Sequence, residues 1–288
     1  NKAIAERIKP EEAKAPKKLS DILDPMKVDS IADEFIRYFD GLFSTEEDEI
    51  SVCILYDSDA DGISAAKNTE AFIRRYVRLL GKENIKIVLK SEGPAVDVRN
   101  IDAKADEIRA LRERERYQSV IIVDLFWGRH LGLMGAVDIL IDHHGLNNGE
   151  IAKEKELLAG HPDSLRLVNL EKVGYKGKSN LMPACVLSFL LLDYTLRKKW
   201  EEALTKPEGE GVELSYYIDA GITGDWADTL WKIYDAEIAN IINILIATGK
   251  DGLKVVEEAK SLEDLKASYE LYSHNIKRAN EIVEKMFE

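Results

Sequence analysis

The segment ISVCILYDSDADGIS, residues 50–64, carries the strongest signals of secondary structure in this chain. Its first seven residues are mostly apolar and rich in β-branched side chains, which is typical of a strand buried on both faces of a parallel sheet. Asp57, Asp59 and Asp61 then alternate with small residues, and Gly62 follows. The stretch therefore predicts a strand that passes through an acidic turn into a helix. Taken alone, it fits equally well an ordinary polar turn in which one aspartate caps the helix.

The rest of the chain continues this alternation of strands and helices. Apolar runs predict further strands at 84–90, 119–126, 137–144 and 165–170, and helical periodicity predicts helices at 28–43, 63–81, 102–116 and 183–200. Such an alternation predicts an α/β fold with a mainly parallel, doubly wound sheet. Beyond residue 230 the pattern is helical only. We therefore expect an N-terminal arm and helix (1–44), an α/β domain (45–230) and a helical C-terminal extension (231–288).

The composition excludes some classes of protein. The chain has 288 residues and is 45% hydrophobic, which is enough for a substantial core. Its 53 acidic residues outnumber 40 Lys and Arg, giving a net charge of −13. This balance argues against a protein that coats nucleic acid by long-range attraction. It leaves room for an enzyme that holds phosphates locally.

The cysteines and the lengths of the apolar runs indicate where in the cell the protein is located. Cys53 and Cys185 lie in apolar segments and form no CxxC pair, so we expect core thiols in a reducing compartment. The first residues lack the apolar centre of a signal peptide. The longest apolar stretch, 185–196, is too short to span a bilayer. The sequence thus predicts a soluble protein of the cytoplasm.

Acidic and imidazole side chains follow the ends of several predicted strands. They are Asp57, Asp59 and Asp61, then Asp124, then Asp142, His143 and His144, and finally Asp225 in the segment GITGDWAD. The carboxyl ends of parallel strands line one edge of a sheet, where ligands bind, so we expect these groups to converge. Like charges brought together are costly, and these turns contain no matching cluster of Lys or Arg. Divalent metal ions would neutralise them.

The kinds of donor atom favour particular metals. Carboxylates with one or two imidazoles and no thiolate favour Mn²⁺ or Mg²⁺ over a structural zinc site. Such a set could hold two ions about 3.5–4 Å apart, the arrangement used to hydrolyse phosphate esters. The helix that begins near Ile63 would present its backbone N–H groups beside the ions, in a place suited to a phosphate oxygen.

Four short motifs resemble those of a known family. They are DSDADG at 57–62, VD at 123–124, DHH at 142–144 and GD at 224–225. In order and in approximate spacing they resemble the four motifs of the DHH phosphoesterase family, over about residues 48–230. The DxDADG form resembles the RecJ branch, including archaeal RecJ-like nucleases that associate with the replication complex GINS.

The resemblance implies roles for individual residues. Those that match the family's metal ligands are Asp59, Asp61, Asp124, His143 and Asp225. Asp124 and Asp225 would bridge the two ions. Asp57 would lie beside the site and orient a ligand or a water molecule. Asp142 would support the imidazoles, and His144 would contact the scissile phosphate.

The resemblance also implies a reaction. We expect a phosphodiesterase dependent on two Mn²⁺ or Mg²⁺ ions, acting as a single-strand-specific 5′-to-3′ exonuclease on DNA or RNA, with roles in DNA replication and repair. Two alternatives stay open. One is a phosphodiesterase for oligonucleotides or cyclic dinucleotides, with pyrophosphate disfavoured by the RecJ-like motif. The other is a scaffold of the replication complex that binds GINS and has weak or no activity.

One feature of the family has no counterpart in this sequence. Family members carry a second, smaller domain with a Gly-Gly motif that holds substrate, whereas these 288 residues contain no Gly-Gly dipeptide. Residues 261–288 resemble the helix that connects to such a domain. We expect either a piece of a longer protein or a natural short form, so the length of the substrate stays open.

Overall fold

An all-parallel sheet lies at the centre of the computed structural model, which describes residues 23–45, 49–92, 101–125, 130–144, 166–175 and 182–200. The strands are β1 (Ile50–Tyr56), β2 (Ile85–Ser91), β3 (Ser119–Val123), β4 (Ile139–Ile141) and β5 (Arg166–Val168). The sheet has five strands in the order β2-β1-β3-β4-β5, and every pairing is parallel. The predicted class, α/β with a parallel sheet, is confirmed.

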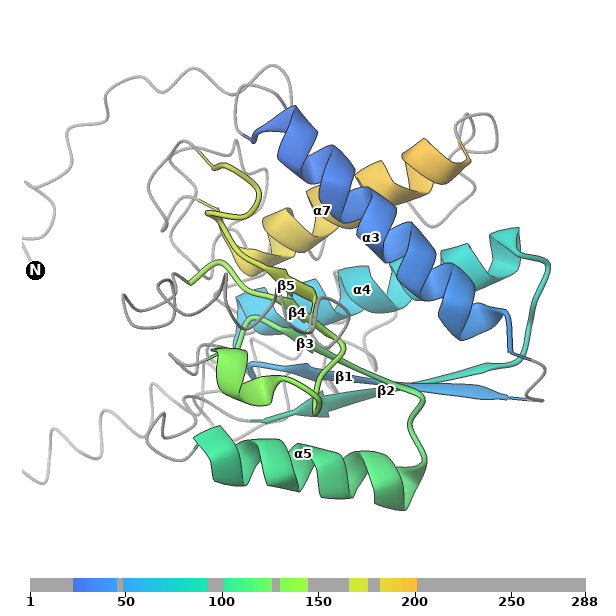
Figure 1. The fold of residues 1–288 in the computed structure, drawn as a ribbon, viewed down its shortest axis with the longest axis vertical. Coiled ribbons are helices and arrows are strands. Elements are labelled where there is room, and N and C mark those ends of the chain that lie inside the picture. The colour runs from blue at the N-terminus through green and yellow to red at the C-terminus, as the bar shows by residue number, and fades with distance from the viewer. Residues whose placement is uncertain are drawn as a thin grey trace, which may run out of the picture.

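Helices cover both faces of this sheet (Figure 1). They are α3 (Pro25–Phe43), α4 (Ala60–Leu79), α5 (Ile101–Glu115) and α7 (Ala184–Lys199), with a short 3₁₀ helix η2 (His130–Leu133). Figure 1 shows α3, α4 and α7 over one face and α5 over the other. The sheet is therefore doubly wound, as the alternation of strands and helices predicted.

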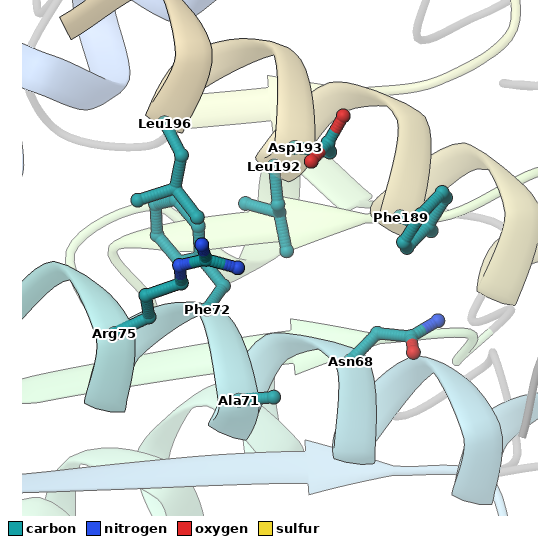
Figure 2. Close-up of a pocket in the computed structure, with 8 residues that line it drawn as sticks. All are labelled: Asn68, Ala71, Phe72, Arg75, Phe189, Leu192, Asp193 and Leu196. Atoms are coloured by element: carbon teal, nitrogen blue, oxygen red, sulfur yellow. The ribbon is translucent and has the colours of Figure 1, made fainter. Parts of the chain in front are cut away.

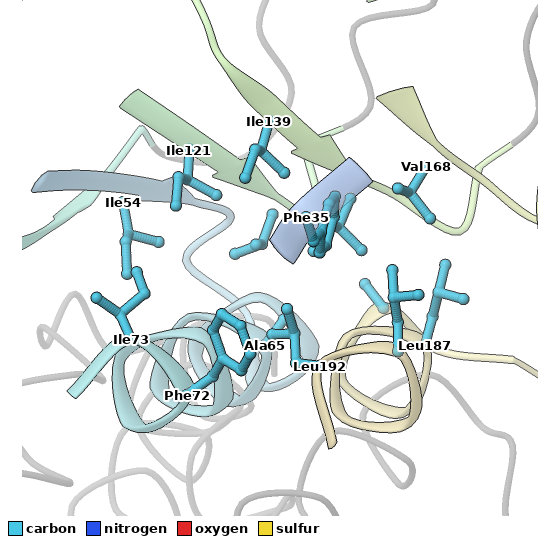
Figure 3. Close-up of a cluster of buried hydrophobic side chains, with 14 of the residues drawn as sticks. Phe35, Ile54, Ala65, Phe72, Ile73, Ile121, Ile139, Val168, Leu187 and Leu192 are labelled. Carbon is cyan, nitrogen blue, oxygen red and sulfur yellow. The ribbon is translucent and has the colours of Figure 1, made fainter. Parts of the chain in front are cut away.

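The alternation of side chains along β1 divides the core in two. Val52, Ile54 and Tyr56 join the apolar cluster under α3, α4 and α7. Cys53 and Leu55 point to the other side and join the cluster with α5. Because side chains alternate between the faces of a strand and both faces are covered, every residue of β1 is buried. Figure 3 shows the larger cluster, with strand side chains facing those of α4 and α7.

Helix α3 belongs to this larger cluster. Asp24 caps its N-terminus by accepting the backbone N–H of Met26 at 3.0 Å, and Pro25 takes the first helical position. The helix therefore begins at residue 25, earlier than the predicted 28. Its buried stripe of Phe35, Phe39 and Phe43 follows the predicted spacing of four residues.

Strands β3 and β4 are shorter than predicted. Strand β3 ends at Val123 and not at residue 126, because Asp124 leaves the extended conformation with φ of 55°. Strand β4 covers only Ile139–Ile141. The polar residues of both segments consequently lie just beyond the strands.

Some sequence predictions lie outside the described residues. These are the part of the N-terminal arm before residue 23, the segment GITGDWAD and the helical extension at 231–288 with its connecting helix at 261–288. Cys53 and Cys185 are buried thiols that form no disulfide, as predicted. Among the described helices, none is both long enough and apolar enough to cross a membrane.

Candidate metal centre

The ends of four adjacent strands lie in register and each is followed by a polar residue. Tyr56, Val123, Ile141 and Val168 pair in a row across β1, β3, β4 and β5. The residues that follow them are Asp57, Asp124, Asp142 and Asn169. The strand order also reverses at β1, because β2 lies on one side of it and β3 on the other. Such a switch point opens a crevice at the carboxyl edge, the usual ligand site of open parallel sheets.

Four side chains at this edge bring their donor atoms together. Asp124, Asp142, His143 and His144 each offer one ligand atom, and these atoms lie within 4.8 Å of one another. Nε2 of His143 is 3.4 Å from Oδ1 of Asp124. The first three of these residues are buried, and His144 is partly exposed. Two carboxylates and two imidazoles without a thiolate suit Mn²⁺ or Mg²⁺, so the residues present fit such an ion.

Asp124 has an unusual backbone conformation. Its φ of 55° lies in the left-handed region, where aspartate is tolerated better than most residues. Its N–H donates to the carbonyl oxygen of Ile141 at 3.0 Å, which ties the turn to the neighbouring strand. Strained backbone of this kind gathers at functional sites, because the surrounding structure holds a side chain where it is needed.

Asp142 contacts His144 in two ways. Its Oδ1 accepts the backbone N–H of His144 at 3.1 Å and lies 2.7 Å from Nδ1 of the same residue. The carboxylate therefore orients the ring and directs Nε2 away from Asp142. The rings of His143 and His144 are tilted against each other, with centroids 4.2 Å apart.

The acidic turn after β1 is organised by its own backbone. Oδ1 of Asp59 accepts the N–H of Gly62 at 2.9 Å and caps α4, which begins at residue 60 and not at 63. One of the first N–H groups of α4, that of Gly62, thus already has a partner within the turn. Burial and the neighbouring Asp59 carboxylate raise the pKa of Asp57 to about 6. The raised pKa shows that the negative charge of this turn is not balanced by positive groups nearby.

Asp61 lies deeper than its neighbours, with no exposed surface. Its Oδ2 accepts the N–H of Ala184 at 2.7 Å, and its Oδ1 accepts the N–H of Cys185 at 2.9 Å. Oδ2 is also 4.0 Å from Nε2 of His143. The sequence analysis did not predict this contact with the start of α7. A proline cannot cap a helix with its side chain, so Pro183 before the helix indicated that the first N–H groups of α7 need another acceptor.

The structure brings most of the predicted site residues to one edge. His143 approaches both Asp61 and Asp124, so the turn after β1 meets the ends of β3 and β4. Among the described residues, the compact group of ligand atoms does not include Asp57, Asp59 or Asp61. Asp225 lies outside the described residues.

Asn169 is a polar residue of this edge that sequence reasoning missed. It follows β5 directly and is 1% exposed. Its Oδ1 accepts the N–H of Lys172 at 2.9 Å. The signal that could have revealed it was a polar residue inside the predicted strand 165–170, directly after Leu167 and Val168.

A second hollow lies between α4 and α7 (Figure 2). Apolar side chains line it together with Asn68, Arg75 and Asp193. Its volume is about 40 Å³, which admits a water molecule or two and no substrate. The carboxyl edge of the sheet is therefore the better candidate for a functional site.

Comparisons with known proteins agree on the fold. No protein-family model and no curated protein matches the sequence. RecJ of Thermus thermophilus, solved in complex with Mn²⁺, aligns over 96% of this chain and 40% of its own, with 16% identity and a TM-score of 0.50. The DHH domain of a member of a ribosomal protein family aligns over 96% and 67%, with 14% identity and a TM-score of 0.55. CDC45 of Entamoeba histolytica aligns over 76% and 38%, with 13% identity and a TM-score of 0.41.

These structural similarities concern the fold. At 16% and 14% identity they establish a shared fold and leave the chemistry to be argued from the site itself. The chain spans 40% of the length of the Thermus RecJ. The activity, substrates and partners of a whole protein therefore do not follow from the alignment.

Proposed function

The chain has the RecJ-like DHH fold, and on this premise we propose that it is a metal-dependent phosphodiesterase. The observation that carries the proposal is the group of Asp124, Asp142, His143 and His144 at the carboxyl edge of the sheet, of which the first three are buried. Buried carboxylates are costly unless a positive charge balances them. A divalent ion supplies that charge at the place where an open parallel sheet binds its ligand.

Asp124 and His143 are the first proposed ligands, because their donor atoms are 3.4 Å apart and both side chains are buried. Asp59, Asp61 and Asp225 complete the set that the sequence motifs predict. Bound divalent ions lower the pKa of coordinated water and balance the charge of a phosphate oxygen. The residues of the chain hold the ions and exclude bulk water around them.

His144 is the residue that we propose to meet the substrate. Its side chain is 40% exposed, whereas that of His143 is 8% exposed. Asp142 holds Nδ1 of His144, so Nε2 is directed away from that carboxylate. When the ring is protonated, Nε2 can donate a hydrogen bond to a phosphate oxygen or pass its proton to the leaving group.

We propose single-stranded DNA or RNA as the substrate, hydrolysed stepwise from the 5′ end with two Mn²⁺ or Mg²⁺ ions. The four sequence motifs support this choice, and so does the fold shared with a RecJ that was solved in complex with Mn²⁺. A net charge of −13 means that the chain would hold nucleic acid through local contacts to phosphates and not through a basic surface. Docking on GINS or another replication protein is part of the same proposal.

An exonuclease assay tests the proposal. Single-stranded DNA and RNA, labelled at either end, would be incubated with Mn²⁺, Mg²⁺ or EDTA. We expect metal-dependent release of mononucleotides from the 5′ end, and a loss of about 10³-fold or more in the Asp124→Asn, His143→Ala double variant. Asp106→Asn, an exposed change on α5, is the matched control and should retain activity.

Two results would redirect the proposal. Cleavage of di- and trinucleotides or cyclic dinucleotides, without cleavage of polymers, would move the substrate to the oligonucleotide class. No turnover of any phosphodiester, together with capture of GINS, would favour the scaffold.

A further inference from the structure

Asn169 begins the turn after β5 with one end of its side chain held by that turn. Its Oδ1 accepts the backbone N–H of Lys172 at 2.9 Å. Because this donor must face the oxygen of the amide, Nδ2 is at the opposite side. The residue is 1% exposed, and within the described part of the chain Nδ2 has no hydrogen-bond partner. A buried NH₂ group without an acceptor is costly, so it indicates a water molecule or a ligand at that place.

The register of the sheet places Asn169 beside the proposed metal centre. Ile141 of β4 pairs with Val168 of β5. The N–H of Asp142 donates to the carbonyl oxygen of Val168 at 3.0 Å. Asp142 and Asn169 are the residues that directly follow this pair. The buried amide therefore lies at the same edge of the sheet as the carboxylates and imidazoles of the site.

The turn that contains Asn169 is anchored by its backbone. The carbonyl oxygen of Asn169 accepts the N–H of Val173 at 3.1 Å, and the carbonyl oxygen of Val173 accepts the N–H of Asp24 at 2.9 Å. Nζ of Lys27 donates to the carbonyl oxygen of Glu171 at 3.2 Å. These contacts join the turn to the start of α3. A side chain fixed in this way loses little freedom when it binds a ligand.

The chemistry of the NH₂ group restricts what it can bind. An amide nitrogen donates hydrogen bonds and does not accept them, whereas Mn²⁺ and Mg²⁺ take oxygen or imidazole donors. The ligand of Nδ2 must therefore offer an acceptor atom. The carboxylates of Asp124 and Asp142 already lie close together at this edge, so an anion that enters needs neutral donors as well as cations. An oxygen of a phosphate drawn in by the metal ions meets both conditions.

We propose that Nδ2 of Asn169 donates a hydrogen bond to a non-bridging oxygen of the phosphate that binds at this centre. Asn169 follows β5, and His144 follows the neighbouring β4, so the two side chains would contact different oxygens of one phosphate. The identification of the acceptor as a phosphate rests on the proposed function. The buried donor itself is a feature of the fold.

Binding of inorganic phosphate to the Mn²⁺-loaded protein, measured by isothermal titration calorimetry, tests the proposal. In Asn169→Asp one carboxylate oxygen can still accept the N–H of Lys172, while the other oxygen replaces the donor. In Asn169→Ser the hydroxyl can accept the same N–H, and no NH₂ group is left. We expect the phosphate affinity to fall by about tenfold or more in both variants, as for the loss of a hydrogen bond to a charged group.

The two variants also guard against a misleading result. Both should unfold cooperatively on heating in EDTA, because Lys172 keeps an acceptor, and either of them is sufficient to test the donor. A loss of affinity in Asn169→Asp without a loss in Asn169→Ser would show charge repulsion alone and would overturn the proposal. An unchanged affinity in both would leave only a bound water molecule at Nδ2 and would overturn it too.

Tyr175 provides a matched control in the same turn. Its hydroxyl is also buried without a hydrogen-bond partner among the residues that the structure describes, but its ring packs against the larger apolar cluster. Tyr175→Phe should leave the phosphate affinity unchanged, since it removes a hydroxyl that faces no ligand. An equal loss of phosphate affinity in Tyr175→Phe would mean that any disturbance of the turn weakens binding, and it would contradict a specific role of Asn169.

Metal binding and turnover separate this role from others. Titration with Mn²⁺, followed by electron paramagnetic resonance, should show the wild-type number of ions in Asn169→Ser. The loss of an ion there would assign Asn169 to the support of the metal and overturn the proposal. A wild-type protein that binds phosphate through Asn169 but hydrolyses no phosphodiester would refute the proposed function and leave the hydrogen bond intact. Hydrolysis by the wild type, with an unchanged phosphate affinity in Asn169→Ser, would refute the hydrogen bond alone.

Discussion

At the scale of single residues, close approach in the acidic turn explains why Gly62 follows the aspartates. A Cβ at position 62 would lie 2.3 Å from the carbonyl oxygen of Asp57 and 2.9 Å from its nitrogen. Both are backbone atoms, so a side chain could fit only if the turn moved. The absence of a side chain at Gly62 is thus what lets the start of α4 fold back onto Asp57.

We therefore expect Gly62→Ala to lower the free energy of unfolding by about 2 kcal/mol or more and to weaken Mn²⁺ binding, because the aspartates would shift. Gly41→Ala is the control. Nothing lies within 4 Å of a Cβ at that position in α3, so alanine should stabilise the helix by about 0.5–1 kcal/mol. Urea unfolding of both variants measures the contrast. Equal effects of the two changes would contradict the close packing at Gly62.

Asp57 gives the metal-free protein a dependence on pH. Burial and the Asp59 carboxylate raise its pKa from 3.8 to about 6, so the folded state holds a proton that the unfolded chain has released. Stability is therefore lost as the pH rises from the unfolded pKa to the folded one. The carboxylate is then an unfavourable charge at neutral pH, and a bound cation would relieve it.

From this shift we expect Asp57→Asn, in EDTA, to be more stable than the wild type at pH 7 by about 1–2 kcal/mol after allowance for solvent screening. The difference should disappear at about pH 4, near the unfolded pKa. Urea unfolding over a range of pH measures both. Asp106→Asn, whose side chain is 77% exposed before the change, should show no such trend. A wild type more stable than Asp57→Asn at pH 7 would refute the expectation.

At the scale of secondary-structure elements, the end of α7 holds α3 against the rest of the fold. Lys199 forms an ion pair with Asp40 of α3. Its Nζ also lies 4.9 Å from the centroid of the Tyr76 ring and 4.8 Å from that of Trp200. Lys198 pairs with Asp29 and Asp33 at 2.7 Å each, on a more exposed surface. The two lysines thus make the same kind of contact in different surroundings.

These surroundings set the expected cost of removing each lysine. Lys199→Ala should lower the free energy of unfolding by about 1–2 kcal/mol, because it removes the contact with two aromatic rings together with an ion pair whose lysine is 17% exposed. Lys198→Ala should cost clearly less, since water screens its exposed partners. Calorimetric unfolding of the two variants compares neighbouring lysines of one helix. A larger loss in Lys198→Ala would show that the aromatic contacts contribute little.

Element boundaries show how far local patterns reach. The apolar run at 50–56 predicted β1 to the residue, because a strand buried on both faces leaves a continuous signature. The start of α3 was placed three residues late, although the capping pair Asp24 and Pro25 is visible in the sequence. The ends of β3 and β4 were placed too late because Asp124 and Asp142 belong to turns whose hydrogen bonds run to neighbouring strands.

At the scale of the whole molecule, strand order decides where the candidate site lies. With the order β2-β1-β3-β4-β5, the turn after β1 and the ends of β3 and β4 share one edge. Residues as far apart in the sequence as Asp61 and His143 become neighbours there. The position of the proposed metal centre is therefore a property of the topology, and low sequence identity to the Thermus RecJ does not alter it.

Local sequence patterns were enough to predict the strands, the helices and most candidate residues, because periodicity and caps depend on interactions between residues close in the chain. The contacts of each carboxylate, in contrast, depend on how distant segments pack together. Asp61 is the clearest case: its partners, Ala184 and Cys185, are 123 and 124 residues away. No local pattern encodes such a pairing, since it arises only when α4 and α7 pack side by side on the sheet and the buried start of α7 needs an acceptor.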